Sequence, residues 1–125
     1  PLIDEILSLK NVRFLGSVPY SEVGSRISEF DIAFIPYKVN KLTDSVTSLK
    51  LYEYLSLGLP IVTTNYSEAK KCKAKLFFID SDDAFEKASL IAESDLKNNF
   101  KTASEKSWLA NTKKIIGLYE NINFK

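Results

Sequence analysis

The chain has 125 residues, of which 45% are apolar and 26% are charged, and these values are ordinary for one compact globular domain. Lys and Arg number 17 against 16 Asp and Glu, so the formal charge of +1 gives no electrostatic case for nucleic-acid binding. The chain has no histidine and a single cysteine, Cys72, which excludes a histidine-based catalytic triad and an internal disulfide. We expect a cytoplasmic protein that holds no metal ion or other cofactor.

Hydrophobic spacing divides the chain into alternating helices and strands, because helices repeat their apolar positions every three to four residues and buried strands are short apolar runs. In the first half we expect a helix over 2–9, a strand over 11–16, a helix that Ser21 caps and that runs to about Phe30, and a strand over 31–36 covered on both faces. In the second half we expect a helix over 47–57, strands over 61–64 and 76–79 around a helical turn at 67–73, and helices over 84–91, 95–106 and from 108 onwards.

Alternating strands and crossover helices favour an α/β fold, with a parallel, Rossmann-like sheet of about four strands and flanking helices. In such a sheet, ligands bind where loops leave the carboxyl ends of the strands, and helix N-termini there present free amides to anions. Two loops meet this description, at residues 16–20 and 37–48. The second leads into a helix that Thr47 or Ser48 can cap, and Gly58 and Pro60 are expected to end that helix.

Residues 44–62 read Asp-Ser-Val-Thr-Ser-Leu-Lys-Leu-Tyr-Glu-Tyr-Leu-Ser-Leu-Gly-Leu-Pro-Ile-Val. This segment resembles the nucleotide-sugar signature of GT-B glycosyltransferases of the broad "group 1" class, which combine such a helix with a Gly-x-Pro turn and a short Val-rich strand. Residues 11–20, residues 31–36 and the pair Ser107-Trp108 resemble other parts of the same domain. The resemblance implies that residues 1–125 form a single partial domain, the C-terminal donor-binding domain, without the N-terminal acceptor-binding domain.

The family's activity is to transfer a sugar from a nucleoside-diphosphate sugar to a glycan or lipid-linked acceptor, in settings such as polysaccharide biosynthesis. The resemblance implies that Glu53 accepts hydrogen bonds from the ribose hydroxyls, that the first amides of its helix face the diphosphate, and that Ser17 and Val18 approach the nucleobase. The remaining candidate donor-binding residues are Ser45, Val46, Thr47, Ser48, Leu49 and Lys50. No catalytic residue is assigned, and the chain alone is not expected to catalyse sugar transfer.

The sequence departs from the family pattern at Ser45, where many members have a glutamate that contacts the donor sugar, and Asp44 is a candidate replacement. The family's basic residues that neutralise the diphosphate are also not found. A non-catalytic nucleotide-sugar-binding or regulatory domain therefore stays open as an alternative. A further alternative is a response-regulator-like domain, for which residues 80–83 would supply an acidic cluster, although they serve equally well to start a helix.

The remaining interpretations concern partners. Residues 70–75 carry four lysines around Cys72 and are interpreted as a solvated surface, with weak peripheral contact to anionic lipid as the alternative. Cys72 is given no catalytic role. Trp108 is interpreted either as a core anchor or, with Ile115 and Tyr119, as part of an exposed apolar patch that docks on the second domain or forms a dimer.

Overall fold

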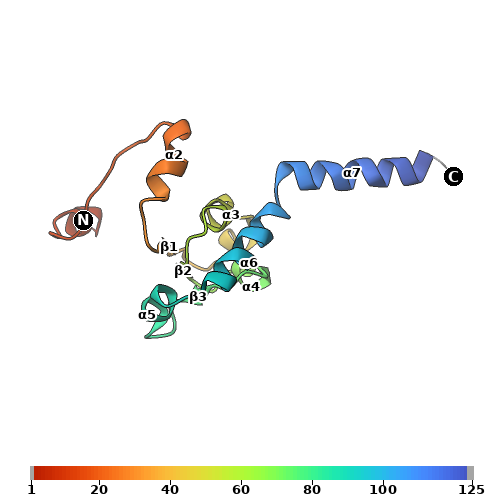
Figure 1. The fold of residues 1–125 in the computed structure, drawn as a ribbon. Helices are drawn as coiled ribbons and strands as arrows, with labels where there is room; N and C mark the ends of the chain where they lie inside the picture. The colour runs from red at the N-terminus through yellow and green to blue at the C-terminus, as the bar shows by residue number, and fades with distance from the viewer. Residues whose placement is uncertain (1, 124–125) are drawn as a thin grey trace.

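The computed structural model describes residues 2–123, and side chains for residues 3–117 (Figure 1). The described helices are α1 Leu2–Leu7, α2 Tyr20–Ile27, α3 Leu49–Ser56, α4 Ser67–Lys71, α5 Ala84–Ser89, α6 Glu93–Ser104 and α7 Trp108–Asn123, with a short 3-10 turn, η1, at Thr43–Ser45. The strands are β1 Ala33–Ile35, β2 Ile61–Thr63 and β3 Phe77–Phe78. Strands and α-helices alternate from β1 to α5, as the hydrophobic spacing predicts.

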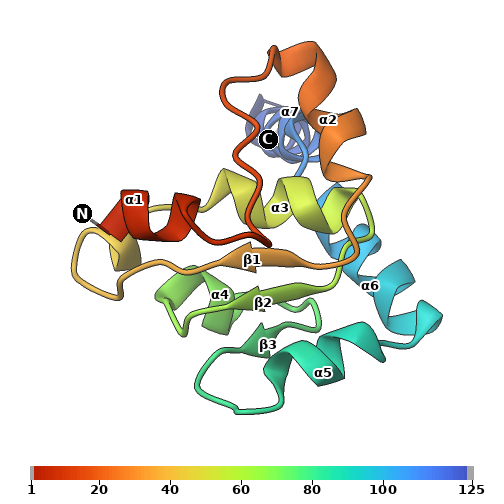
Figure 2. The ribbon, with the colours of Figure 1, turned by 90° about the vertical axis from the view of Figure 1, so that its left-hand side faces the viewer.

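The strands form one parallel sheet in the order β1-β2-β3, so that β2 lies in the centre (Figure 2). Phe34 pairs with Val62, and Val62 in turn pairs with Phe77. Helix α3 connects β1 to β2, and α4 connects β2 to β3. The α/β class, with a parallel Rossmann-like sheet flanked by helices, is therefore confirmed, although residues 2–123 form three strands where about four were expected.

The N-terminal segment differs from the prediction. Residues 11–16 form no strand, and Figure 1 shows this stretch leading from α1 to α2 away from the sheet. Phe14 is 76% exposed and Leu15 is 45% exposed, so this stretch buries little apolar surface. Ser21 does not cap α2, which begins one residue earlier after Pro19 and without a side-chain cap. An alternating apolar pattern forms a strand only when a neighbouring strand accepts its hydrogen bonds.

Helix α3 packs on one face of the sheet. Leu51 and Leu55, which lie one turn apart on α3, are fully buried against Ile35 and Ile61. Helix α6 packs against α3, and its Ala103 belongs to the same core cluster. Burying two leucine side chains completely contributes several kcal/mol, at about 1.5–3 kcal/mol each. Helix α3 is therefore held between the sheet and α6.

The opposite face of the sheet is covered less completely. Val62 is fully buried there beside Ala84 and Ala88 of α5. Phe34 of β1 points to this face and is 42% exposed, with its ring in tilted contact with Phe85 at 5.4 Å. The prediction that the strand over 31–36 is covered on both faces is wrong at Phe34 of β1, because α5 packs mainly over β2 and β3 and covers the Phe34 ring only in part, through Phe85.

Helix α3 ends as the sequence predicts. Gly58 follows its last turn with φ of 73°, a left-handed conformation that glycine adopts without steric cost. The chain then reverses into β2, and Pro60 accepts a 2.9 Å hydrogen bond from the amide of Ala33 at the start of β1. This turn fixes the position of α3 along the sheet.

Helix α7 projects from the rest of the molecule as a separate arm (Figure 1). Trp108 is 89% exposed, which excludes a core anchor, and Ile115 is exposed as well. The side chain of Tyr119, the third residue of the expected patch, lies outside the described residues. Within the part of the chain that the structure describes, no helix combines the length and the hydropathy that a membrane-spanning segment needs.

The packing of α3 predicts a large difference between two leucines of the same helix. Leu55→Ala is expected to lower the free energy of unfolding by about 2–5 kcal/mol, because it leaves a cavity in the core. Leu49→Ala, at a position that is 73% exposed, is expected to change it by about 0.5 kcal/mol or less. Urea denaturation followed by circular dichroism measures both values, and equal losses would contradict this packing.

Candidate functional site

The first turn of α3 is fixed by a buried serine. Ser48 is the N-cap residue, and its Oγ accepts a 3.3 Å hydrogen bond from the amide of Leu51. The hydroxyl of Tyr37 lies 3.4 Å from the same Oγ. The predicted cap at this position is confirmed. The amides of Leu49 and Lys50, which come before Leu51, have no carbonyl partner within the helix because they lie in its first turn.

A pair of tyrosines lies beneath this cap. The rings of Tyr37 and Tyr66 meet edge to face with their centroids 5.2 Å apart. Tyr66 is fully buried, and its hydroxyl is the buried side-chain polar atom without a hydrogen-bond partner among the described residues. Burial raises the pKa of Tyr66, so the hydroxyl stays protonated. The sequence gives no signal for this pair, since the two residues meet only through the tertiary fold.

The loop between β1 and α3 is tied to the next crossover. Thr64 Oγ1 donates a 2.7 Å hydrogen bond to the carbonyl of Tyr37. Asp44 Oδ1 accepts a 2.8 Å hydrogen bond from the amide of Ser67, the first residue of α4. One carboxylate oxygen of Asp44 is thus engaged in starting α4, which weakens its case as a replacement for the missing glutamate. Ser45 is exposed, and its Oγ donates to the carbonyl of Lys41 at 2.7 Å.

Glu53 lies in a cleft between α2 and α3. The cleft has a volume of about 390 Å³, and Glu53 is the carboxylate among its lining residues, where it is half-buried. Most of the surrounding wall comes from α2, including Tyr20, Val23 and Ile27. A half-buried carboxylate in a largely apolar cleft can accept hydrogen bonds from two neighbouring hydroxyl groups of a ligand.

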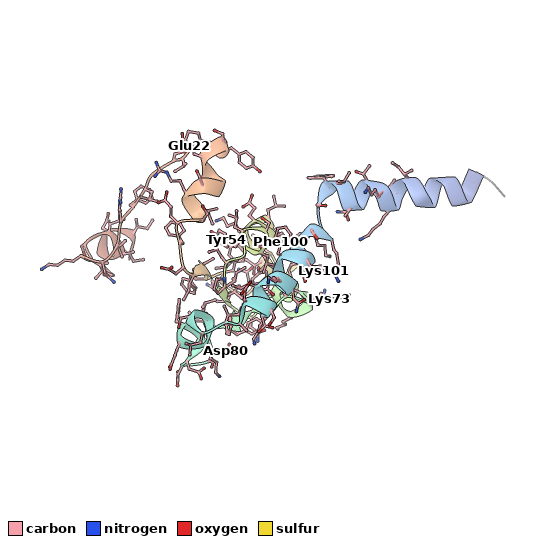
Figure 3. The ribbon with its side chains drawn as sticks, in the orientation of Figure 1. Glu22, Tyr54, Lys73, Asp80, Phe100 and Lys101 are labelled. Carbon is pink, nitrogen blue, oxygen red and sulfur yellow. The ribbon has the colours of Figure 1, made fainter. Side chains whose placement is uncertain are left out.

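Ser17 and Val18 lie on the other side of α2 from this cleft. They line a hollow of about 250 Å³ together with Arg13, Glu22 and Arg26. Glu22, labelled in Figure 3, lies on one face of α2. The opposite face of α2 lines the cleft that contains Glu53. The structure therefore does not bring Ser17 and Val18 together with Glu53.

Two further predicted residues line a separate cavity at the start of α3. Thr47 and Leu49 face Lys106 and Trp108 across a volume of about 420 Å³. This cavity provides a cation beside the first turn of the helix. Val46 and Lys50 are exposed and line none of these cavities. Sequence reasoning missed Lys106, because nothing local links residue 106 to the loop that precedes α3.

The acidic residues after β3 do not form a metal site. Asp83 accepts a hydrogen bond from Ser81 and pairs with Lys87 at 2.8 Å. The hydrogen bond from Lys87, followed by that from Ser81, holds the pKa of Asp83 below its usual value. Asp83 occupies the N-cap position of α5, but its carboxylate makes no cap bond. Among the described residues, no group of three or more His, Cys, Asp or Glu could hold a metal ion.

A parallel α/β sheet with a capped helix after a strand and a half-buried carboxylate in a neighbouring cleft is typical of a domain that binds a small ligand. No family model matches the chain, and no solved structure matches it. Over 67 residues, 54% of its length, the chain is 37% identical to "Putative teichuronic acid biosynthesis glycosyltransferase TuaH" of Bacillus subtilis (strain 168). The match spans 17% of that protein's length. The similarity supports a relationship to glycosyltransferases in general and does not indicate a particular family or donor.

Removing the cap should destabilise the domain measurably. Ser48→Ala is expected to lower the free energy of unfolding by about 1 kcal/mol, because the Leu51 amide loses its acceptor. Ser56→Ala on the same helix is the matched control, since the Ser56 hydroxyl is exposed and bonds only to the carbonyl of Glu53. A denaturation midpoint that shifts equally in both variants would contradict the role of Ser48.

The single cysteine allows a direct test of its protonation. Cys72 is half-buried, and burial raises the pKa of its thiol, so the thiol is neutral at physiological pH. Alkylation by iodoacetamide, which requires the thiolate, should therefore reach its half-maximal rate at a higher pH in the folded chain than in urea. An inflection at or below that of the unfolded chain would indicate an activated thiol instead.

Proposed function

We propose that this chain is the donor-binding part of a glycosyltransferase that transfers a sugar from a nucleoside-diphosphate sugar to a glycan or lipid-linked acceptor. The observation that carries the proposal is the geometry of α3, which combines a capped N-terminus with a half-buried carboxylate, Glu53, in an adjoining cleft. The similarity to a protein named as a glycosyltransferase of teichuronic acid biosynthesis supports glycosyl transfer, with polysaccharide biosynthesis as the setting.

The diphosphate is proposed to lie at the start of α3. The first amides of the helix point away from its body, and the helix dipole places partial positive charge there. Ser48 holds this turn rigidly by accepting from the Leu51 amide. Lys106, which lines the neighbouring cavity with Thr47 and Leu49, adds a full positive charge close to the same turn. No metal ion is part of the proposal.

The ribose is proposed to bind Glu53. Because a helix turns by about 100° per residue, Glu53 lies roughly opposite the buried Leu51 and Leu55 and therefore faces the cleft beside α2. A carboxylate has enough lone pairs to accept from two vicinal hydroxyls at once. The apolar wall from Val23 and Ile27 strengthens these hydrogen bonds by excluding water from one side. Ser45 stays a predicted donor contact, and Ser17 and Val18 stay predictions that this placement of the ribose does not use, because they line a separate hollow.

The rest of the enzyme is proposed to supply the acceptor site. The exposed apolar residues of α7, which include Trp108, Leu109, Ile115 and Ile116, are proposed to dock on an acceptor-binding domain. A dimer formed through the same residues is the competing arrangement. Under this proposal the isolated chain binds the donor weakly and does not turn it over.

Nucleotide titrations test the donor site. UDP or GDP is expected to bind the chain with a Kd of about 0.1–1 mM, measured by ligand-observed NMR. Glu53→Gln is expected to weaken this affinity about tenfold or more, because two hydrogen bonds to a charged acceptor are lost. Glu86→Gln, an exposed glutamate on α5, is the control and should bind as the unmodified chain does.

Two outcomes would contradict the proposal. If UDP, GDP and their sugar conjugates all fail to bind, the start of α3 is not a diphosphate site. If a nucleotide binds but Glu53→Gln binds it equally well, the ribose does not lie in the cleft between α2 and α3.

A further inference from the structure

A further cavity, separate from the Glu53 cleft, is lined by lysine side chains from several parts of the chain. It has a volume of about 320 Å³ and lies where α3, α4, α6 and α7 approach one another. Figure 3 labels Lys73 near α4 and α6. The charged side chains around the cavity are Lys71, Lys73, Lys106, Lys114, Glu68 and Glu105.

In the described part of the chain the lysines of this cavity have no carboxylate partner, as is also true of exposed lysines such as Lys50 and Lys101, but here the fold brings four of them around one cavity. Lys75, Lys87 and Lys97 each form an ion pair within 2.8 Å. Among the described residues, none of the four cavity lysines forms an ion pair. The Nζ of Lys106 lies 6.0 Å from the ring centroid of Tyr52, a cation–π contact that leaves its hydrogen-bond donors free for another partner.

The carboxylates of the cavity do not balance this charge. Four lysines meet two glutamates, so positive charge is in excess. Glu68 accepts a hydrogen bond from the hydroxyl of Tyr52, which occupies one of its oxygens. Burial, and then the hydrogen bond to Glu68, raises the pKa of Tyr52, so this hydroxyl keeps its proton. Unpaired like charges in one cavity repel each other, and an anion that binds there relieves the repulsion.

We propose that this cavity binds a phosphate group. A phosphate monoester carries a charge of about −1.5 to −2 near neutral pH, and its oxygens accept hydrogen bonds from several ammonium groups. The volume lies at the lower end of the range for small-molecule sites, which suits a phosphate and the first atoms attached to it. The phosphate comes either from a free anion or from the headgroup of an anionic phospholipid.

The site combines residues that are distant in the sequence. Lys71 is the last residue of α4, Lys73 lies two residues further on, and Lys114 lies on α7. The lysine-rich stretch over 70–75 therefore does not act as one uniform surface, because Lys75 turns away to pair with Asp95 at 2.7 Å. The cavity adjoins the proposed diphosphate position, because Tyr52 and Lys106 line both cavities, but Lys71, Lys73 and Lys114 belong to this one alone.

A titration of the whole 125-residue chain with inorganic phosphate tests the proposal. Amide shifts in the ¹H–¹⁵N spectrum are expected to saturate at Lys71, Lys73 and Lys114, whereas potassium chloride at equal ionic strength should not reproduce them. Lys71→Gln combined with Lys114→Gln is expected to raise the Kd about tenfold or more. Lys71→Arg with Lys114→Arg should stay within about threefold, and so should the control pair Lys87→Gln with Lys97→Gln.

A second arm distinguishes the sources of the phosphate. Sedimentation with phosphatidylglycerol vesicles, against phosphatidylcholine vesicles, is expected to recover the chain only if a lipid headgroup can enter the cavity. Binding to phosphate without binding to vesicles assigns the site to a free anion, and lysine-dependent binding to both assigns it to the headgroup. Absence of saturable shifts, or an equal loss in the Lys87 and Lys97 control pair, would overturn the proposal. Unchanged circular dichroism spectra show that the variants are folded.

Discussion

The burial of Leu51 and Leu55 is the constraint on which the rest of the structure depends. These side chains hold α3 between the sheet and α6, and the helix cannot rotate without exposing one of them. Since the orientation of α3 is fixed, so are the direction of its first amides and the position of Glu53 in the cleft beside α2. The core and the proposed donor site therefore share one helix, and a change in its packing alters both.

Much of the fold follows from local sequence. The three strands and their crossover helices come from short apolar runs and helical spacing, and the ends of α3 come from Ser48 and Gly58, whose effects act over a single turn. The stretch over 11–16 has the same kind of apolar pattern and forms no strand. The apolar pattern alone could not reveal this difference. A segment becomes a strand only when it pairs with another strand, and the residues of the segment do not show whether such a partner is available.

The candidate site could be predicted only in part. Ser48 and Glu53 lie on a helix whose sequence is distinctive. Their environment is tertiary: Tyr66 beneath the cap, the bond from Ser67 to Asp44, and Lys106 beside the first turn all join residues that are far apart in the chain. The lysines over 70–75 show the same limit, because the sequence presents them as one charged run, whereas in the fold Lys75 pairs with Asp95 and Lys71 and Lys73 line a separate cavity.

β1 is an edge strand of the sheet, and this position affects how readily the protein can aggregate. In the described chain its outer edge meets no other strand, and such an edge is a template on which an extended peptide from another molecule can assemble. The strand is three residues long, and Pro36, which has no backbone N–H to offer, follows immediately. A strand this short, followed by a proline, offers few backbone groups to such a peptide, which lowers the tendency of this edge to aggregate, although the partly exposed ring of Phe34 lies on the same strand.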